Sequence, residues 1–356
     1  MNLSDIGWDD FFEIGFEEFR DRGFVPARVA REDKEAYLVF SEHGELTARV
    51  SGRMRHDAQS RSEFPAVGDW VAIQARPKEG EATIHAVLPR KSRFSRKVPG
   101  GRTEEQVLAA NVDTVFLVSG LDANFNVRRI ERYVTLAWDS GAGPVILLNK
   151  ADVCDDVQAR ISEVESAAFG VAVHAISATE NEGLDVLGKY ISKGKTVAFL
   201  GSSGVGKSTI INSLLGEERQ KVNAISEAIG KGKHTTTHRE LIVFPGGGVV
   251  IDTPGMRELQ MWCDEDGLKQ SFDDIEELTH LCRFTNCRHA TEPGCAIKKA
   301  LAEGALDAER YGNYLRLQKE LRFLARRQDH RARLADRAKW KKITMNGRKA
   351  NREKWR

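Results

Sequence analysis

The chain has 356 residues, more than one ordinary hydrophobic core accommodates, and its apolar fraction of 41% is sufficient for two or three domains. The formal net charge is only +2, but residues 319–356 carry 15 Lys or Arg against 4 Asp or Glu, and the preceding residues carry 39 against 48. A basic end on an acidic body favours a polyanionic partner such as RNA, although a solvated helix with a frayed end has the same composition.

The sequence lacks the features of membrane and secreted proteins. No apolar run approaches the roughly 18 residues that span a bilayer, and the N-terminus lacks the basic start and apolar centre of a signal peptide. Five cysteines, three of them within 14 residues, do not resemble a secreted disulfide framework. We therefore expect a cytoplasmic protein without membrane contact. Separately, we expect a monomer.

Residues 1–24 predict an amphipathic helix that packs on the rest of the chain. The aromatic residues at helical spacing are Trp8, Phe12, Phe16 and Phe19. Residues 25–95 predict a small barrel, because apolar and polar residues alternate in five segments. The expected strands are 27–32, 36–42, 45–51, 69–76 and 82–88. A barrel of this length has the size of an oligonucleotide-binding (OB) fold, although SH3-like barrels show the same pattern.

The middle of the chain predicts a parallel α/β sheet. A basic connector at residues 90–102 contains a proline and two glycines and is expected to be an exposed linker. Residues 104–263 then alternate apolar runs with helical segments, as in sheets that are covered on both faces. The expected strands are 113–120, 144–150, 171–177, 196–202 and 248–255. We assign residues 264–320 to a small helical domain and 321–356 to a basic tail.

The segment GSSGVGKS at residues 201–208 matches the phosphate-binding pattern G-x-x-x-x-G-K-S. An apolar strand precedes it and a helical segment follows it, which is the context that such a loop requires. Its glycines allow backbone N–H groups to surround phosphate oxygens at a helix N-terminus. We expect Lys207 to reach the β- and γ-phosphates and the Ser208 hydroxyl to bind Mg²⁺.

Two later segments complete a triphosphate site. Asp252 ends the apolar strand of GVVIDTPG, where a carboxylate can hold the Mg²⁺ shell, and the Gly255 N–H can contact the γ-phosphate. The intervening segment GKGKHTTTH contains three consecutive threonines, one of which can close over Mg²⁺. Among these three we choose Thr236, although the residue types alone do not separate them.

The segment LLNKAD at residues 147–152 indicates guanine rather than adenine. The Asp152 carboxylate can accept hydrogen bonds from guanine N1–H and N2–H₂, groups that adenine does not present. Asn149 can meet the O6/N7 edge, and the stem of Lys150 can pack over the ring. An ATPase could use the phosphate motifs equally well, so this segment decides the nucleotide.

These motifs stand in a rotated order along the chain. Ser177 and Ala178, at the end of a later strand, supply the second base-contacting loop, and both base loops precede the phosphate loop. Opening a closed α/β domain in one loop and joining its old termini produces this order without changing the sheet. The strand that ends at Asp252 then leads directly into the C-terminal domain, so that domain can respond to the γ-phosphate.

The residue that follows Gly255 is Met256, where many GTPases carry a glutamine that orients the attacking water. Methionine cannot take this role, so we expect slow intrinsic hydrolysis. The missing group would come from the threonine loop, where His234 and His238 are candidates, or from a partner. Both histidines could equally be ordinary exposed loop residues.

A cysteine-rich segment near the C-terminus predicts a structural metal site. It has the spacing C-x₄-C-x-H-x₅-C, and its ligands are Cys282, Cys287, His289 and Cys295. Three thiolates and one imidazole form a closed tetrahedral set for Zn²⁺, with no open position for catalysis. The basic residues around it are Arg283, Arg288, Lys298 and Lys299. They favour a phosphate-bearing partner.

The order LLNKAD, ISA, GSSGVGKS, GKHTTTH, DTPGMREL and CRFTNCRHATEPGC closely resembles the family of ribosome small-subunit-dependent GTPase A (RsgA, YjeQ or YloQ). The resemblance implies an OB barrel, a circularly permuted GTPase domain and a zinc domain. It also implies GTP hydrolysis that the small ribosomal subunit stimulates during its late maturation, with the subunit and its 16S rRNA as partners.

The resemblance assigns roles to positions of this chain. Guanine contacts fall on Asn149, Lys150, Ala151 and Asp152, beside Ser177 and Ala178. Phosphate and Mg²⁺ contacts of bound GTP or GDP fall on Gly201, Ser202, Ser203, Gly204, Val205, Gly206, Lys207, Ser208 and Thr209.

Two other functions use the same motifs. In a non-catalytic, GTP-dependent RNA-binding module, the nucleotide would be structural, and Met256 permits this interpretation. In a signalling GTPase with a protein partner, partner binding would depend little on salt, whereas an rRNA contact weakens steeply as salt rises. The basic tail favours RNA.

Overall fold

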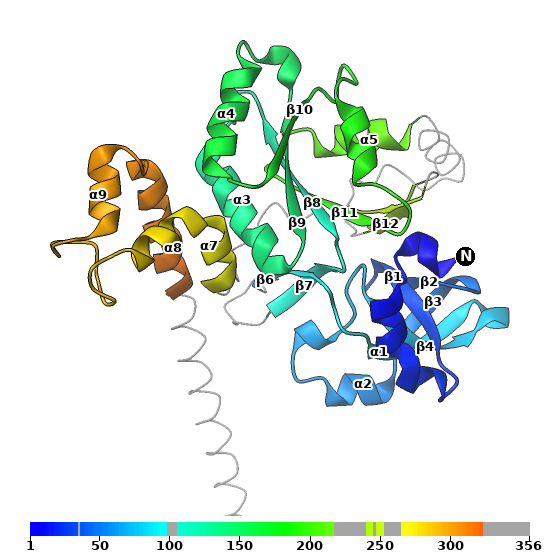
Figure 1. The fold of residues 1–356 in the computed structure, drawn as a ribbon. Coiled ribbons are helices and arrows are strands. Elements are labelled where there is room, and N and C mark those ends of the chain that lie inside the picture. The colour runs from blue at the N-terminus through cyan, green and yellow to red at the C-terminus, as the bar shows by residue number, and fades with distance from the viewer. Residues whose placement is uncertain (35, 98–104, 217–239, 245–246, 253–264, 323–356) are drawn as a thin grey trace, which may run out of the picture.

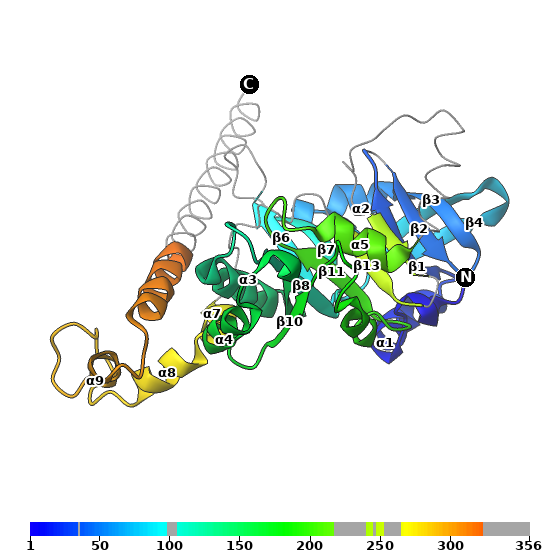
Figure 2. The ribbon, with the colours of Figure 1, turned by 90° about the horizontal axis from the view of Figure 1, so that it is seen from above.

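The computed structural model describes residues 1–34, 36–97, 105–216, 240–244, 247–252 and 265–322. Figures 1 and 2 show a barrel at one end, an α/β sheet in the middle and a small helical unit at the other end. Within the described ranges, no helix combines the length and apolar character needed to cross a membrane.

Five strands close into the N-terminal barrel. They are β1 (Val25–Glu32), β2 (Tyr37–Ser41), β3 (Gly44–Val50), β4 (Trp70–Arg76) and β5 (Glu81–Val87). Their order is β1-β2-β3-β5-β4, with β4 pairing back to β1 and β3 parallel to β5. The short helices α2 (Gly52–Asp57) and η2 (Arg61–Glu63) connect β3 to β4, and η3 (Pro77–Glu79) precedes β5. The predicted five-stranded OB-like barrel is confirmed.

The predicted N-terminal amphipathic helix is α1 (Asp10–Arg20), which follows the short helix η1 (Leu3–Ile6). Its Phe12 and Phe16 are buried against the barrel. Trp8 precedes the helix and meets Trp70 of β4 edge-on, with ring centroids 4.7 Å apart. The aromatic stripe therefore packs on the body, as its spacing predicted.

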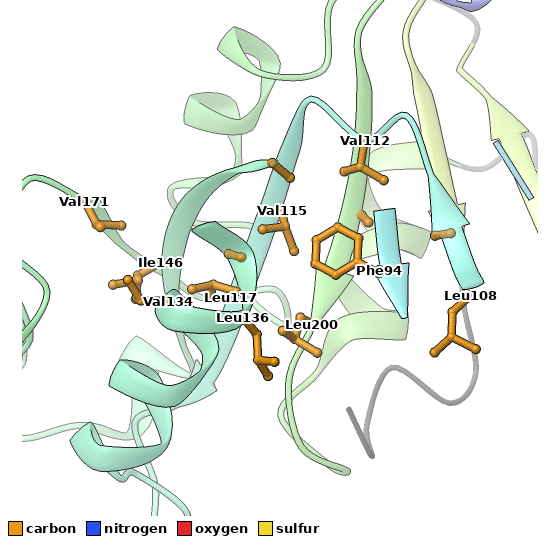
Figure 3. Packing of buried hydrophobic residues seen from close by; sticks show 14 of the residues in the cluster. Phe94, Leu108, Val112, Val115, Leu117, Val134, Leu136, Ile146, Val171 and Leu200 are labelled. Atoms are coloured by element: carbon orange, nitrogen blue, oxygen red, sulfur yellow. The ribbon is translucent and has the colours of Figure 1, made fainter. Parts of the chain in front are cut away.

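The expectation of an exposed linker over residues 90–102 is wrong for part of this segment. Residues of β6 (Arg93–Lys97) pair with β7 (Glu105–Ala110) in a two-stranded sheet. Phe94 is 2% exposed and lies in the main hydrophobic cluster, as Figure 3 shows. With one large apolar residue among basic ones, the strand has no clear alternation, and its partner lies beyond a turn-like segment. The sequence pattern therefore concealed it.

The α/β sheet has the strand order β10-β9-β8-β11-β13-β12. Its strands are β8 (Thr114–Gly120), β9 (Gly143–Asn149), β10 (Ala172–Ile176), β11 (Thr196–Leu200), β12 (Glu240–Val243) and β13 (Val249–Asp252). All pairs are parallel except β12 with β13, so the predicted parallel strands are confirmed. The antiparallel strand β12 was not predicted.

Helices cover this sheet and bury its apolar side chains. They are α3 (Val127–Ser140), α4 (Val157–Ala167) and α5 (Lys207–Leu215), with the short η4 (Ala151–Val153) and η5 (Leu184–Lys189) in the connections. Figure 3 shows Leu117, Val134, Leu136 and Ile146, from β8, α3 and β9, in one buried cluster. Close-packed contacts of this kind hold α3 on the sheet.

The barrel and the sheet are joined into one body. Strand β12 pairs with β1 at Glu240 and Arg31, so the barrel continues the sheet. Arg28 of β1 is only 1% exposed and donates to the carbonyls of Ile6, Gly68 and Asn111. Since a buried guanidinium is stable only when its donors are satisfied, these bonds hold the two parts in one arrangement.

The C-terminal unit is helical and lies against α3, at the end of the molecule away from the barrel (Figures 1 and 2). It contains α7 (Glu265–Ser271), α8 (Asp273–His280), α9 (Ala296–Glu303) and a helix over residues 308–322. Helix α7 packs so closely on α3 that a side chain at Gly267 would collide with Asp139. The small helical domain expected after the sheet is therefore present.

Candidate nucleotide site and metal cluster

The predicted base-reading and phosphate-binding residues lie at one edge of the sheet. Asn149 ends β9, Ser177 follows β10, Gly201 follows β11 and Asp252 ends β13. These four strands are parallel, so their carboxyl ends meet at the same edge. Ligands of open α/β sheets bind at this edge, and here it collects motifs that are far apart in the chain.

Asn149 joins three loops at this edge. Its side chain is buried, donates from Nδ2 to the Val205 carbonyl at 2.8 Å, and accepts at Oδ1 from the Ala178 N–H at 3.0 Å. The base-reading segment, the second base loop and the phosphate loop are thus tied to one amide. The second hydrogen of the Nδ2 group is not needed for these bonds and is available to a ligand.

Asp152 and Ser177 also meet across the edge. The Ser177 hydroxyl is fully buried and donates to Asp152 Oδ1 at 2.5 Å. Ser177 in turn exchanges two backbone hydrogen bonds of 3.0 Å with Glu182, which hold its loop. The exposed Asp152 carboxylate is therefore oriented from one side and open on the other.

Lys150 has a partner that the sequence motifs did not reveal. It stands in the left-handed backbone region, with φ of 66°, and its ammonium donates to Asp122 Oδ2 at 2.6 Å. This hydrogen bond lowers the pKa of Asp122 below its ordinary value. Asp122 lies two residues after β8, the strand next to β9, so its position at the strand end is the signal that could have identified it.

The phosphate loop connects β11 to α5 and needs glycine at defined positions. Gly206 has a φ of +98°, and a side chain there would collide with the Asn149 amide. A side chain at Gly201 would collide with the Val118 carbonyl of β8. The loop therefore passes close to its neighbours, and the glycines of the motif are sterically required.

Lys207 begins α5 and curls back over the loop. Its ammonium donates to the carbonyls of Gly201 and Ser202, both at 2.7 Å. Ser208 and Thr209 in the first turn of α5 are exposed, as are Ser203 and Gly204 in the loop, whereas Val205 is buried. A helix N-terminus, exposed hydroxyls and an adjacent cation together form a surface that suits phosphate and Mg²⁺.

Part of the predicted triphosphate site lies outside the described residues. Asp252 is described and half-buried at the end of β13. Thr236, Gly255, Met256 and the two candidate histidines, His234 and His238, fall in residues 217–239 and 253–264, which are not described. The basic tail from residue 323 onward is not described either.

The four predicted metal ligands converge in the C-terminal unit. Their donor atoms all lie within 4.8 Å of one another. Nδ1 of His289 is 3.6 Å from Sγ of Cys282 and 3.4 Å from Sγ of Cys295, and the two sulfurs are 3.9 Å apart. Zinc–sulfur and zinc–nitrogen bonds of ordinary length require edges of about 3.8 and 3.6 Å in a tetrahedron, so the donor set fits a metal ion of this size.

Local structure favours a thiolate at Cys282, whereas desolvation and the neighbouring thiols raise the pKa of Cys287. Cys295 stands at the N-cap position of α9, and the backbone N–H groups of Ala296 and Ile297 donate hydrogen bonds to the Cys282 thiol. Although burial raises the pKa of the Cys282 thiol, these backbone hydrogen bonds bring it below the ordinary value. Donors at a helix N-terminus favour the charged, metal-binding form of cysteine.

Comparison with known proteins identifies the family. Residues 87–262 match the family model described as RsgA GTPase. A small ribosomal subunit biogenesis GTPase of Opitutus terrae is 48% identical, with 99% of this chain and 98% of the relative covered. A protein of the same description from Syntrophotalea carbinolica is 44% identical, with 99% of both chains covered.

Solved structures show the same fold. The crystal structure of YjeQ from Thermotoga maritima has a TM-score of 0.63 at 27% identity and covers 84% of this chain and 98% of its own. The structure of YloQ, described as a circularly permuted GTPase, has a TM-score of 0.60 at 26% identity and covers 84% and 95%. The chain therefore belongs to the RsgA family of circularly permuted GTPases, and its enzymatic activity is GTP hydrolysis.

Proposed function

We propose that this GTPase binds the small ribosomal subunit through its 16S rRNA and couples GTP hydrolysis to the late maturation of that subunit. The curated relatives named above are described as small ribosomal subunit biogenesis GTPases, at up to 48% identity over nearly the whole chain. The observation that carries the nucleotide part is Asn149, which ties both base loops to the phosphate loop.

In this proposal the base loops read guanine. Asp152, oriented by Ser177, accepts from N1–H and N2–H₂, and Lys150 packs over the ring. The Asn149 amide supports the loops and offers its second hydrogen to the O6/N7 edge. Ala151 and Ala178 contribute backbone at the same edge. Adenine would leave the carboxylate without donors, so discrimination against ATP should be large.

The phosphate loop and α5 hold the phosphates in this proposal. Backbone N–H groups of residues 201–209 surround the phosphate oxygens, and Lys207 moves from the loop carbonyls to the β- and γ-oxygens. Ser208 and Asp252, with Thr236 from the threonine loop, hold Mg²⁺, and Gly255 contacts the γ-phosphate. The bound Mg²⁺ supplies charge neutralisation when GTP is hydrolysed.

The metal of the C-terminal unit is proposed to be Zn²⁺ with a structural role, since three thiols and one imidazole leave no ligand position for substrate. Exposed basic residues flank it and are candidates for phosphate contacts: Arg283, Arg288, Lys298 and Lys299. Further exposed arginines lie on the barrel: Arg49, Arg53 and Arg55. Together with the basic tail, these groups support an rRNA partner.

The proposed functional units are residues 1–24, 25–95, 104–263, 264–320 and 321–356, acting as a cytoplasmic monomer. The N-terminal helix packs on the barrel, the barrel and the C-terminal unit carry the RNA contacts, and the central unit turns over GTP. Because Met256 cannot orient water, intrinsic turnover should be slow and the subunit should stimulate it.

Steady-state hydrolysis of GTP by the pure protein, alone and with small or large ribosomal subunits, tests the proposal, with ATP as the control nucleotide. We expect strong stimulation by the small subunit only and no turnover of ATP. If neither subunit stimulates although GTP binds, the alternative gains support: a GTP-dependent RNA-binding module without catalysis. In that case Lys207→Met would leave activity in cells intact, whereas the proposal requires that it is lost.

A further inference from the structure

Helix α3 touches the phosphate loop at its N-terminal end. Arg129 in its first turn donates from Nη1 to the Ser202 hydroxyl at 3.3 Å and to the Asn124 carbonyl at 3.4 Å. Asn126 caps the helix by accepting from the Arg129 N–H at 2.9 Å. A change in the position of this first turn would therefore reach the loop that we assign to phosphate binding.

Two residues after Arg129, the same helix contacts the C-terminal unit through Glu131. The Glu131 carboxylate is 2% exposed. Its Oε1 accepts from Arg310 at 2.8 Å and from Arg128 at 3.1 Å, and its Oε2 accepts from Asn313 at 2.8 Å. Arg310 and Asn313 belong to the helix over residues 308–322, so one buried carboxylate joins the central unit to the C-terminal unit.

Arg310 completes a network in which each charge has several partners. It is 6% exposed, holds Asp274 of α8 through two hydrogen bonds of 2.9 and 2.6 Å, and donates to the Ala167 carbonyl of α4 at 2.6 Å. Losing one member of such a network leaves a buried charge without compensation, which is strongly unfavourable. The network therefore specifies one position of the C-terminal unit on α3.

The junction combines this polar network with apolar packing, since Leu268 and Phe272 of the C-terminal unit lie in the same buried cluster as Val134 of α3. An open surface pocket of about 760 Å³ lies beside the network, with Asp122, Arg128, Arg160, Asp307 and Arg310 among its lining residues. At the rim, Arg128 pairs with Asp307 at 2.7 Å and Arg132 pairs with Glu320 at 3.0 Å. Because close-packed interiors transmit strain, a displacement of the C-terminal unit would be passed on to α3.

We propose that α3 transmits the position of the C-terminal unit to the phosphate loop, with Arg310 and Arg129 as positioning residues at the two ends of this route. When the C-terminal unit contacts a partner, its position relative to Glu131 changes. The first turn of α3 moves with it, and Arg129 then displaces Ser202 of the phosphate loop. The proposal rests on the assigned role of the phosphate loop, and it adds a route that is independent of the chain connection through residues 253–264.

A double-mutant cycle on nucleotide affinity tests this route. The variants are Arg129→Met, which removes the donor to Ser202, Arg310→Gln, which removes the charge at the junction, and the double variant. Affinities for GDP and GTP are measured by titration on the full chain. We expect Arg310→Gln to weaken GDP binding about fivefold in the wild-type background and less than about twofold in the Arg129→Met background.

Several controls keep the result interpretable. Thermal unfolding and metal content establish that Arg310→Gln is folded; if it is not, Arg132→Gln at the half-exposed rim replaces it, with a smaller effect of the same kind. Arg76→Gln removes two exposed ion pairs of the barrel, with Glu79 and Glu81, and should leave GDP affinity unchanged. If the effects of the two variants multiply independently, α3 does not couple the sites and the inference is overturned. If the wild type binds no GDP, the proposed function itself fails.

Discussion

Two regions are held in position by different means: the nucleotide edge, which is the sheet edge with the base loops and the phosphate loop, and the cluster of Cys282, Cys287, His289 and Cys295. Asn149, Ser177 and Gly201 each stand where a buried strand ends, so the hydrogen bonds of the sheet place their backbones. The candidate metal ligands lie in residues 282–295, a segment just before α9 that contains no helix or strand. Their supports are α8 and α9, each only eight residues long.

Each region contains a residue in the left-handed backbone region, Lys150 with φ of 66° and His289 with φ of 58°. This conformation is uncommon for residues with a side chain and persists where the surroundings impose it. For Lys150 the surroundings are β9, η4 and the bond to Asp122. For His289 the surroundings include the thiols of Cys282 and Cys295, which its imidazole contacts and which a metal would draw together. We therefore expect the fold alone to form the nucleotide edge, and the cluster to depend on a bound metal.

Gly206→Ala should break the nucleotide edge alone. The new side chain collides with the Asn149 amide at a backbone φ of +98°, so the loop and the two base loops cannot keep their arrangement. We expect GDP affinity to fall by about 100-fold, the equivalent of about 3 kcal/mol of strain, with metal content unchanged. A GDP titration that finds binding within threefold of the wild type would show that the loop is not sterically constrained in this way.

Cys295→Ala should break the cluster alone. Loss of one thiolate removes the metal, and residues 282–295 then lose the restraint that orders them. Metal analysis should find no bound ion, and amide hydrogen exchange should accelerate in this segment but not in β8, β9 and β11. GDP binding should persist, weakened by no more than about fivefold, the coupling through α3. Unchanged protection in a metal-free variant would contradict this dependence.

Ser177→Ala should sharpen the comparison by loosening one contact within the nucleotide edge. The Ser177 hydroxyl donates to the Asp152 carboxylate, and hydrogen bonds to charged groups contribute about 1.5–3 kcal/mol. GDP affinity should therefore fall about tenfold, and the preference for GDP over ADP should narrow. The matched control is Ser166→Ala, which removes an exposed hydroxyl that donates to the Ser162 carbonyl of its own helix. Equal losses in both variants would deny Ser177 a specific role.

Asp122→Asn should have the smallest effect. The hydrogen bond from Lys150 lowers the pKa of Asp122 in the folded protein. The contact therefore stabilises the fold in full at pH values above the ordinary pKa of an aspartate, and this stabilisation is lost as the pH falls through the lowered pKa. Thermal unfolding should show a small difference between wild type and variant at pH 7 that disappears in strong acid. A difference that grows on acidification has the wrong sign for this account.

The sequence predicted well where the motifs of the nucleotide edge lie in the sheet, because each motif carries its own context of strand, turn and helix; their roles in binding stay predictions. Apolar runs followed by glycine or polar residues are enough to place the phosphate loop and LLNKAD at strand ends. Asp122 was missed although its position just after β8 was a usable signal, and its partner Lys150 is distant in the chain. Arg129 could not be identified, since it is a single residue that acts through Ser202, which is also distant in the chain.

Other features escaped because their signal is not local. The strand β6 has one large apolar residue, Phe94, and depends on pairing with β7. The Glu131 and Arg310 pair looks like two ordinary surface charges in the sequence, and only the packing of distant helices buries it. Tertiary contacts therefore form β6 and bury the Glu131–Arg310 pair, whereas periodicity and motif spacing are enough to predict the barrel strands and the phosphate loop.

The central claim is that Asp152 makes the nucleotide edge specific for guanine. Its most direct test is to measure the affinities of GDP, ADP and xanthosine diphosphate (XDP) for the wild type and for Asp152→Asn. Xanthine carries a carbonyl where guanine carries the N2 amine, so an amide at position 152 can donate where the carboxylate accepted. The account predicts that the wild type prefers GDP by at least about 100-fold and that Asp152→Asn reverses the preference to XDP. An Asp152→Asn variant that keeps the wild-type preference for GDP would contradict it, because guanine would then be read elsewhere.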